Sequence, residues 1–424
     1  MDGTIHRGAG AHPATRWLAA ALTLPLTCTA QGGWHGELEG RLQVDDLRSE
    51  GPAIRLEQWA DLLWRDEERR ENATIRFALR EGPDGPEGHI YQLAWSVERG
   101  RDRLTAGRFD QIDGSGFYAL DGLRLKLRGE RSEWRLFTGV PQRIDGLTGL
   151  SGGFLAGMEW RRPVAHLIDL LPGERLDTRL GLSRQWNGGA TATRLTWEAV
   201  TADPEPPTVS GLQYLALAGS VRLDEWRMDN LTAGARIGLQ EGVMQIAIDH
   251  YRPPEERVDF RDRFYQAYAR VGQERLVAAW HHPESGAGGV RLEGRLVRRE
   301  GGGTGAGAAV EKGGALPDEW RWHLRADHLG FGDESVTSLY ATLDRPLDSH
   351  TELRAEGVVQ RRESVTSGTD PLLGIALHLR RRLRAGLTVA LSAELIGGAE
   401  GGDEYRLLLT IRRPLSAGGA RTEP

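Results

Sequence analysis

The sequence alternates between apolar and polar residues with a period of two, and this pattern constrains the fold more than any other feature. Residues 123–128 read Leu-Arg-Leu-Lys-Leu-Arg, so three leucines share one face and three cations share the other. Residues 387–395 repeat the alternation with Leu-Thr-Val-Ala-Leu-Ser-Ala-Glu-Leu. Successive side chains of a β-strand point to opposite faces, whereas a helix needs a period of about 3.6. The pattern therefore predicts strands with one apolar face.

Many such segments follow one another between residues 36 and 413, separated by clusters of Gly, Pro, Asp and Asn. We therefore expect an all-β fold, namely a transmembrane antiparallel up-and-down β-barrel of about 22 strands, within a range of roughly 16–22. The polar composition, with a mean hydropathy of −0.44 and 27% charged residues, agrees with this expectation. A barrel tolerates such polarity because only alternate residues face lipid.

The lengths of the predicted links give an independent indication of topology. If the first strand starts in the periplasm, the short links 99–102, 129–132, 240–242 and 273–274 fall on the periplasmic side, and the longer links 81–89, 141–153 and 252–264 fall outside. This register includes a strand at 265–272 and interprets the glycine-rich residues 300–318 as a flexible loop. That loop would lie on the periplasmic side, so either it is unusual or the strand count slips by one hairpin.

Tryptophans lie near the ends of the predicted strands rather than at their centres. In membrane barrels aromatic residues form girdles at the two membrane interfaces, whereas a soluble sandwich would bury them in mid-strand. The residues expected in the girdles are Trp34, Trp64, Trp134, Trp160, Trp186, Trp280 and Trp320.

The N-terminus has the composition of a secretory signal peptide. Basic residues precede an apolar run that ends in Cys-Thr-Ala at residues 28–30, and the run is shorter than the about 20 residues that a spanning helix needs. We expect a signal peptide at 1–30, an outer-membrane barrel at 31–413 and a flexible tail at 414–424. The only cysteine, Cys28, falls in the leader, so the mature chain would have no disulfide or thiolate chemistry.

Residues 104–127 carry a resemblance to a known class of proteins. A Gly-Arg pair at 107–108 ends one predicted strand, a glycine-containing loop follows, and an Asp-Gly pair at 121–122 starts the next strand. With the charge ladders and the aromatic girdles, this segment resembles porin-like bacterial outer-membrane barrels, although no short motif fixes one family. The resemblance implies an integral outer-membrane location. The chain departs from the pattern because it has no terminal aromatic residue.

The sequence motifs give little support to an enzymatic or cofactor-dependent function. Residues 149–153 (Gly-Leu-Ser-Gly-Gly) match a nucleophile pattern but lie in a predicted outer loop, and the glycine run at 301–314 lacks the Ser or Thr of a P-loop. His281 and His282 are adjacent in a strand and point to opposite faces, which makes them poor joint metal ligands. We therefore expect no enzyme, no metal site, no cofactor and, at a net charge of −6, no nucleic-acid partner.

The expected functional surface is the lumen, which the charged faces of the strands would line. These residues could tune solute selectivity, or could only stabilise the wall through ion pairs between neighbouring strands. The lumen-lining candidates are Arg41, Arg76, Arg124, Lys126, Arg135, Arg179, Arg236, Arg295, Arg321, Arg354, Arg380, Arg406, Glu39, Asp249, Glu293, Glu356 and Glu394.

Three functions are compatible with such a barrel. The first is a porin-like channel for passive diffusion of small polar solutes through an arginine-rich lumen. The second is the barrel sheath of a porin-cytochrome electron conduit, in which a periplasmic or lumen-filling protein partner carries the haems, since the chain has no CxxCH motif. The third is a polysaccharide export channel. Outer-membrane lipid is a partner in all three.

Overall fold

A computed structural model describes most of the chain, and it is built almost entirely from β-strands. The described residues are 33–46, 53–82, 85–113, 116–142, 153–165, 175–187, 189–201, 211–252, 272–283, 288–332, 334–364, 368–399 and 402–417. The predicted signal peptide, residues 149–152 of the nucleophile-like motif, residues 265–271 of the expected strand 265–272 and residues 418–424 lie outside these ranges. No helix in the described ranges has the length and apolar character needed to cross a membrane.

Twenty-two strands and one short 3₁₀-helix make up the described chain. They are β1 (Gly33–Asp46), β2 (Ala53–Asp66), β3 (Glu71–Gly82), β4 (Gly85–Arg99), β5 (Asp102–Asp113), β6 (Gly116–Arg128), β7 (Glu133–Gln142), β8 (Gly153–Ala165), β9 (Arg175–Asn187), β10 (Ala190–Thr201), β11 (Gly211–Arg222), β12 (Arg227–Leu239), β13 (Gly242–Tyr251), β14 (Gln273–Pro283), β15 (Gly289–Arg299), β16 (Gly303–Ala315), β17 (Arg321–Phe331), β18 (Glu334–Asp348), β19 (Thr351–Ser364), β20 (Gly368–Arg382), η1 (Arg384–Gly386), β21 (Thr388–Ala399) and β22 (Gly402–Ala417).

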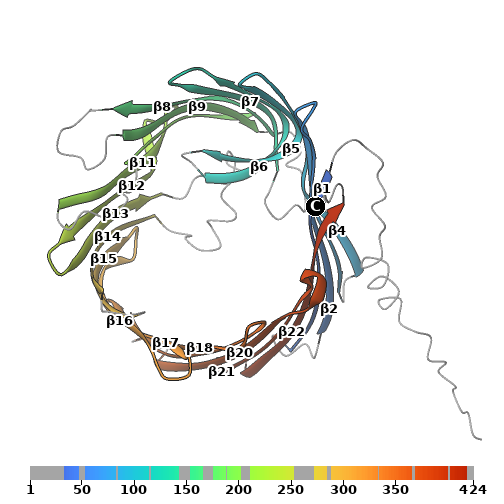
Figure 1. Cartoon of the computed structure of the whole chain (residues 1–424). Coiled ribbons are helices and arrows are strands. Elements are labelled where there is room, and N and C mark those ends of the chain that lie inside the picture. The colour runs from blue at the N-terminus through green and yellow to red at the C-terminus, as the bar shows by residue number, and fades with distance from the viewer. Residues whose placement is uncertain are drawn as a thin grey trace, which may run out of the picture.

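The strands form one closed antiparallel barrel. Each strand pairs with its neighbour in sequence, and β1 pairs with β22 from Trp34 opposite Ala417 to Asp46 opposite Tyr405. The ring is visible in Figure 1. Arg412 joins the two ends, because its guanidinium donates to Glu39 Oε2 at 2.9 and 2.7 Å. The predicted fold class, an up-and-down barrel of about 22 strands, is confirmed.

The strand count agrees although one segment was interpreted wrongly. Residues 303–315, expected to be part of a flexible loop, form β16, and the expected turn at 273–274 is the start of β14. The expected strand 265–272 lies almost wholly outside the described residues. β22 also continues to Ala417, four residues past the expected boundary of the barrel. The loop that lay on the unexpected side of the membrane is therefore a strand between two short links.

β16 is a strand because of its neighbours rather than its own side chains. Glycine and alanine have low strand propensity, yet β16 pairs along its length with β15 and β17. Its small residues leave room for the long side chains of the flanking strands. A Cβ at Gly307 would lie 2.8 Å from Arg295 Nε, and the Arg295 guanidinium crosses β16 to pair with Asp327 on β17.

The apolar faces of the strands form the outside of the barrel. Side chains two strands apart meet only on the polar face, as Arg103 on β5 does when it donates to Asn72 Oδ1 on β3 at 2.9 Å. Side chains converge in this way on the concave side of a curved sheet. The opposite face carries exposed leucines such as Leu123, Leu292 and Leu377, with exposed fractions of 51%, 44% and 51%.

Aromatic side chains pair at the two ends of this apolar belt. At the end expected to be periplasmic, Trp34 lies opposite Trp64, and the Trp134 and Trp160 rings are 6.3 Å apart. At the other end the rings of Phe154 and Trp186 are 5.7 Å apart. Rings at two levels, with apolar residues between them, match the girdles of membrane barrels.

Three strand ends leave the wall and fold into the barrel. We call this element the flap; it comprises residues 109–113 of β5, 116–121 of β6 and 140–142 of β7. β5 pairs with β4 only up to Arg108, and β7 pairs with β8 only up to Gly139. Figure 1 shows the ends of β5 and β6 inside the ring.

The flap turns at a crease of three glycines that lie opposite one another. Gly107 pairs with Gly122, and Gly122 pairs with Gly139. A Cβ at Gly122 would lie 1.9 Å from the Thr138 carbonyl oxygen, and Gly107 has a φ of 108° that favours glycine. Only glycines allow the backbones to approach this closely.

The apolar residues change face at the crease. Below it, Leu123 and its neighbours point outward; beyond it, Phe109, Tyr118 and Leu120 lie on the opposite face and are at most 1% exposed. They pack with Phe137 and Leu155 of the inner wall. This cluster holds the flap in the lumen because its apolar surface is removed from water there, whereas with the flap in the wall the same side chains would face the aqueous lumen.

Candidate channel lining

The seventeen predicted lining residues all lie on the inner side of the strands. Cross-strand neighbours show this directly: Arg354 lies opposite Asp344, Glu394 opposite Arg406, and Asp249 opposite Arg275. The inner position follows from the strand register; whether the side chains select solutes is a separate question. The structure brings most of them together in ion-paired groups.

Most of the predicted cations have an acidic partner. Lys126 Nζ is 2.7 Å from Glu133, Arg135 Nε is 2.8 Å from the same carboxylate, and Arg179 reaches Glu198 at 3.2 Å. Other cations contact acidic or aromatic groups: Arg41 with Glu39 and Glu57, Arg76 with Asp61 at 2.8 Å, Arg354 with Glu356 at 2.6 Å, Arg380 with Glu352 at 4.0 Å, Arg406 with Glu394 at 3.2 Å and Arg236 over the Tyr214 ring at 5.7 Å. Arg321 lies opposite Asp344. Pairs of this kind stabilise the wall and also cancel charge.

One such network spans β15 to β17. Glu293 is 3.2 Å from Arg291 and 3.8 Å from both Arg295 and Arg325, and Arg325 also reaches Glu311 at 3.2 Å and Asp327 at 3.1 Å. Three carboxylates and three guanidinium groups thus share one stretch of the inner wall. Arg325 and Glu311 were not among the predicted residues. The alternation of 321–327 could have identified Arg325, but Glu311 required recognition of β16 as a strand.

An aromatic group on β2 and β4 was also missed. Tyr91 is the extra residue of a bulge between β3 and β4, and its ring stacks on Trp59 with centroids 5.0 Å apart. Arg41 and Arg80 lie over the Trp59 ring at 5.2 and 5.8 Å. A bulge re-aims one side chain, so simple alternation does not place Tyr91.

The inner wall of β10–β12 is polar and buried. Arg194 and Arg222, which lie opposite each other, are 3% and 1% exposed. Arg194 Nε donates to Asp229 Oδ2 at 2.9 Å, and Arg222 Nε lies 3.8 Å from the same oxygen. Asp229 separates two like charges that would otherwise repel each other. This arrangement supports a structural role for both arginines.

The inner faces of β5–β7 below the crease are strongly cationic. The inward-facing residues include Arg103, Arg124, Lys126, Arg128 and Arg135. Their carboxylate partners are Glu133 on β7 and, on the flanking strands, Glu98 at 3.7 Å from Arg103 and Glu159 at 3.5 Å from Arg135. We call these five cations the cationic patch. Arg124 lies over the Phe109 ring at 4.6 Å and donates to the Asp110 carbonyl oxygen at 2.9 Å. The patch therefore continues up to the base of the flap.

The fold and its surface define the class of protein. Each of the twenty-two described strands pairs with two neighbours in a closed ring, and the outer face is an apolar belt between aromatic girdles. The protein is an integral β-barrel of the bacterial outer membrane with a porin-like architecture.

Comparisons with known proteins were made for sequence and for structure. No protein-family model matches the sequence, and no curated protein matches it significantly. OpdQ from Pseudomonas aeruginosa is similar in structure, with 11% identity and a TM-score of 0.45 over 92% of this chain and 100% of that chain. OccK1 (OpdK) from the same organism has 10% identity and a TM-score of 0.47 over 91% and 99%. The P pilus usher PapC translocation pore has 10% identity and a TM-score of 0.43 over 91% and 100%.

Proposed function

We propose that the protein is a porin-like channel for passive diffusion of small polar solutes across the outer membrane, with a preference for anions. The observation that carries the proposal is the cationic patch inside a closed barrel. Five cations face three carboxylates, because Arg103 lies 3.7 Å from Glu98 of β4 and Arg135 lies 3.5 Å from Glu159 of β8, in addition to the pairs with Glu133. This part of the wall therefore keeps a net positive charge, whereas the three cations and three carboxylates of the β15–β17 network balance. Charges on a pore wall set the sign of the solutes that enter.

The flap gives the bore its asymmetry. It occupies the side of the lumen next to β7 and β8, where Gln111 Nε2 of β5 lies 3.4 Å from Glu159 Oε1 of β8. On its other face Asp110 lies 3.7 Å from Arg76 of β3. Solutes would therefore pass along the remaining wall, in contact with the cationic patch and the ion-paired networks.

Planar-bilayer recordings of the purified protein test the proposal. We expect discrete conductance steps and, across a KCl gradient, a reversal potential that indicates chloride preference. The double variant Arg103→Glu/Lys126→Glu changes the patch from five cations to three and adds two carboxylates, so the preference should shift towards potassium. Arg131→Glu, a charge reversal of the same kind at one residue of the exposed turn after β6, should shift it much less than reversal of either patch residue alone.

Two results would contradict the proposal. One is a folded, membrane-inserted protein that gives no conductance and co-purifies with a lumen-filling protein, which would favour the sheath of an electron conduit. The other is a reversal potential that does not respond to the double variant, because selectivity would then be set elsewhere.

A further inference from the structure

The wall of the barrel is interrupted where the flap leaves it. Residues 85–92 of β4 pair with β3 only, because the pairing of β4 with β5 begins at Leu93 opposite Arg108. On the other side, the pairing of β7 with β8 ends at Gly139 opposite Leu155. Within the described part of the chain, no strand joins these two edges. We call this gap between residues 85–92 of β4 and residues 153–154 of β8 the wall opening.

The sequence of the flap opposes its return to the wall. Arg108, Asp110 and Asp121 continue the outward-facing positions of β5 and β6, so a flap in the wall would turn three charged side chains towards the membrane. Charges on the lipid face of a barrel are unfavourable by about 2–4 kcal/mol for a cation at mid-membrane. The burial of Phe109 and Leu120 in the lumen acts in the same direction.

Arg108 stabilises the opening without closing it. It binds Asp121 through two hydrogen bonds of 2.6 and 2.7 Å, and its third nitrogen donates to the Ile90 carbonyl oxygen at 2.6 Å. That carbonyl belongs to the edge of β4 that β5 has left. An unpaired backbone group is costly in a membrane, so a side-chain donor at this edge allows the gap to persist.

The outer rim of the wall opening is apolar. Ile90 and Leu93 of β4 are 47% and 52% exposed, and Phe154 of β8 is 44% exposed. All three lie on the outward face of the barrel. Apolar side chains of this kind are compatible with the acyl chains of the membrane.

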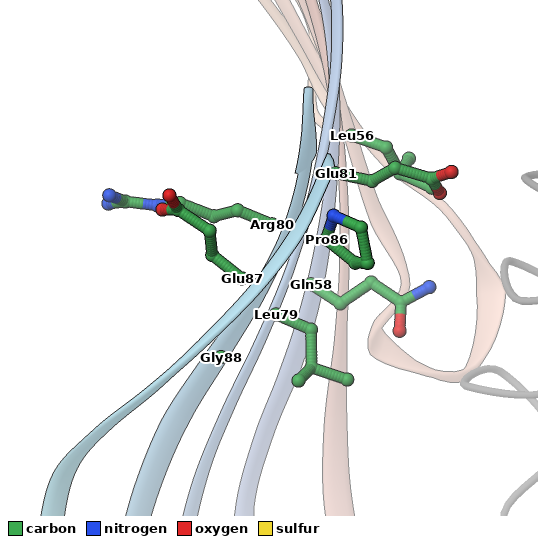
Figure 2. Close-up of a pocket in the computed structure, with 8 residues that line it drawn as sticks. All are labelled: Leu56, Gln58, Leu79, Arg80, Glu81, Pro86, Glu87 and Gly88. Carbon is green, nitrogen blue, oxygen red and sulfur yellow. The ribbon is translucent and has the colours of Figure 1, made fainter. Parts of the chain in front are cut away.

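A hollow on the outward face of β2–β4 adjoins the freed edge of β4. Its lining includes Leu56, Leu79 and Pro86. Figure 2 shows these side chains projecting to one side of the strands, while Arg80 and Glu87 project to the other, luminal side. Gln58 and Glu81 project to the same side as the leucines, so the hollow combines apolar surface with an amide and a carboxylate beside the wall opening.

The inner wall below the wall opening carries a net positive charge. The cationic patch lies directly below the crease on β5–β7, and Arg124 reaches the Asp110 carbonyl at the base of the flap. Ile112, which shares a flap face with Asp110, is 59% exposed. An apolar rim that leads to a cationic wall matches a molecule with an apolar chain and an anionic head.

From this arrangement we infer that the wall opening is a lateral port for single-chain amphiphiles with an anionic head group, such as long-chain carboxylates, that exchange between the lumen and the outer leaflet. The chain enters past Ile90 and Phe154 while the head group meets the cationic patch. The port is a second route into the lumen, and its use by an amphiphile does not depend on ion flow through the bore. An experiment that contradicts the port therefore differs from one that contradicts the proposed channel.

Photo-crosslinking in lipid vesicles tests the port. p-Benzoylphenylalanine replaces Ile112 on the flap or, as the control, Ser338 on the inner face of β18 opposite Asp327. The vesicles are phosphatidylcholine with radiolabelled oleate. We expect about tenfold more oleate adduct at position 112 than at 338. Burial of two methylene groups of the oleate chain at the port would raise the occupancy of the port by roughly that factor. Equal labelling would mean that oleate arrives through the bore, and absence of labelling at 112 would overturn the port.

The head-group part of the inference has its own readout. Arg103→Gln/Lys126→Gln should lower the oleate adduct at position 112, whereas Arg131→Gln in the exposed turn should leave it unchanged. If the benzoylphenylalanine variant does not assemble, Ile112→Cys in a Cys28→Ala background can carry a bimane label. Dibrominated stearate in the vesicles should quench that label, and a label at Ser338→Cys should stay bright. Equal quenching at the two positions would contradict the port.

Discussion

Arg295 illustrates how single side chains determine the inner wall. Its guanidinium pairs with Asp327 two strands away, and this is possible because Gly307 on the strand between them has no side chain. The barrel wall therefore depends on a small residue at that position as much as on the charges. The same reasoning explains why β16 is rich in glycine and alanine.

The role of Gly307 gives a prediction with a matched control. Gly307→Ala should lower the free energy of unfolding by about 1–3 kcal/mol, because the new Cβ would lie 2.6 Å from the His328 carbonyl oxygen and 2.8 Å from Arg295 Nε. Gly294→Ala, on β15, meets nothing within 4 Å and should be neutral or slightly stabilising. Chemical unfolding from lipid vesicles measures both. Equal effects of the two substitutions would show that the space above Gly307 is not required.

At the residue level, alternation predicted the face of a side chain but not its partner. Arg354 and Glu394 lie on the expected face because each strand keeps its period of two. Tyr91 could not be placed, because a bulge shifts the register by one residue, and the sequence alone has no signal for that shift. Arg80 and Arg412 have the same pattern as the predicted residues and could have been included.

At the level of elements, the flap is the part of the barrel that departs most from regular alternation. The Gly107-Arg108 and Asp121-Gly122 pairs were predicted to be a strand end and a strand start, but they lie inside β5 and β6, at the point where these strands leave the wall. The change of apolar face at the glycines, which signals an inward fold, is also present in the sequence. Its meaning becomes clear only when Gly107, Gly122 and Gly139 are seen in register.

The anchoring of the flap is testable by a pair of leucine truncations on β6. Leu120→Ala removes a side chain that is 0% exposed in the inner cluster and should cost about 2–5 kcal/mol of unfolding free energy. Leu123→Ala, on the same strand but 51% exposed on the outer face, should cost less because lipid fills the space. Unfolding followed by tryptophan fluorescence compares the two. A larger loss at Leu123 would contradict an inward-folded flap.

β16 and the expected strand 265–272 show the limit of pattern-based prediction for elements. β16 has almost no apolar alternation, and its backbone forms a strand because it pairs along its length with β15 and β17. Strand propensity reflects how a side chain packs against its neighbours, so a glycine-rich strand between two regular ones has little local signal. The count of strands agreed only because this omission was balanced by a segment that the structure does not describe.

At the level of the whole molecule, the closed cylinder followed from repetition along the chain. Many short amphipathic segments with an even count imply a barrel with both ends on one side. Closure itself depends on contacts between the first and last strands, such as Glu39 with Arg412, which lie 373 residues apart. Those contacts have no local sequence signal. The wall opening also has no local sequence signal, because it arises where the pairing of β4 with β5 and of β7 with β8 ends.

Site-directed spin labelling along one strand tests the central claim most directly. Single cysteines at positions 123–128 of β6, introduced into a Cys28→Ala background and labelled in lipid vesicles, sample the wall just below the crease. If the outer face of the barrel contacts lipid, oxygen dissolved in the bilayer should relax the labels at 123, 125 and 127. A water-soluble nickel complex in the lumen should instead relax the labels at 124, 126 and 128. Accessibility without this period of two, or accessibility to the nickel complex on both faces, would contradict it.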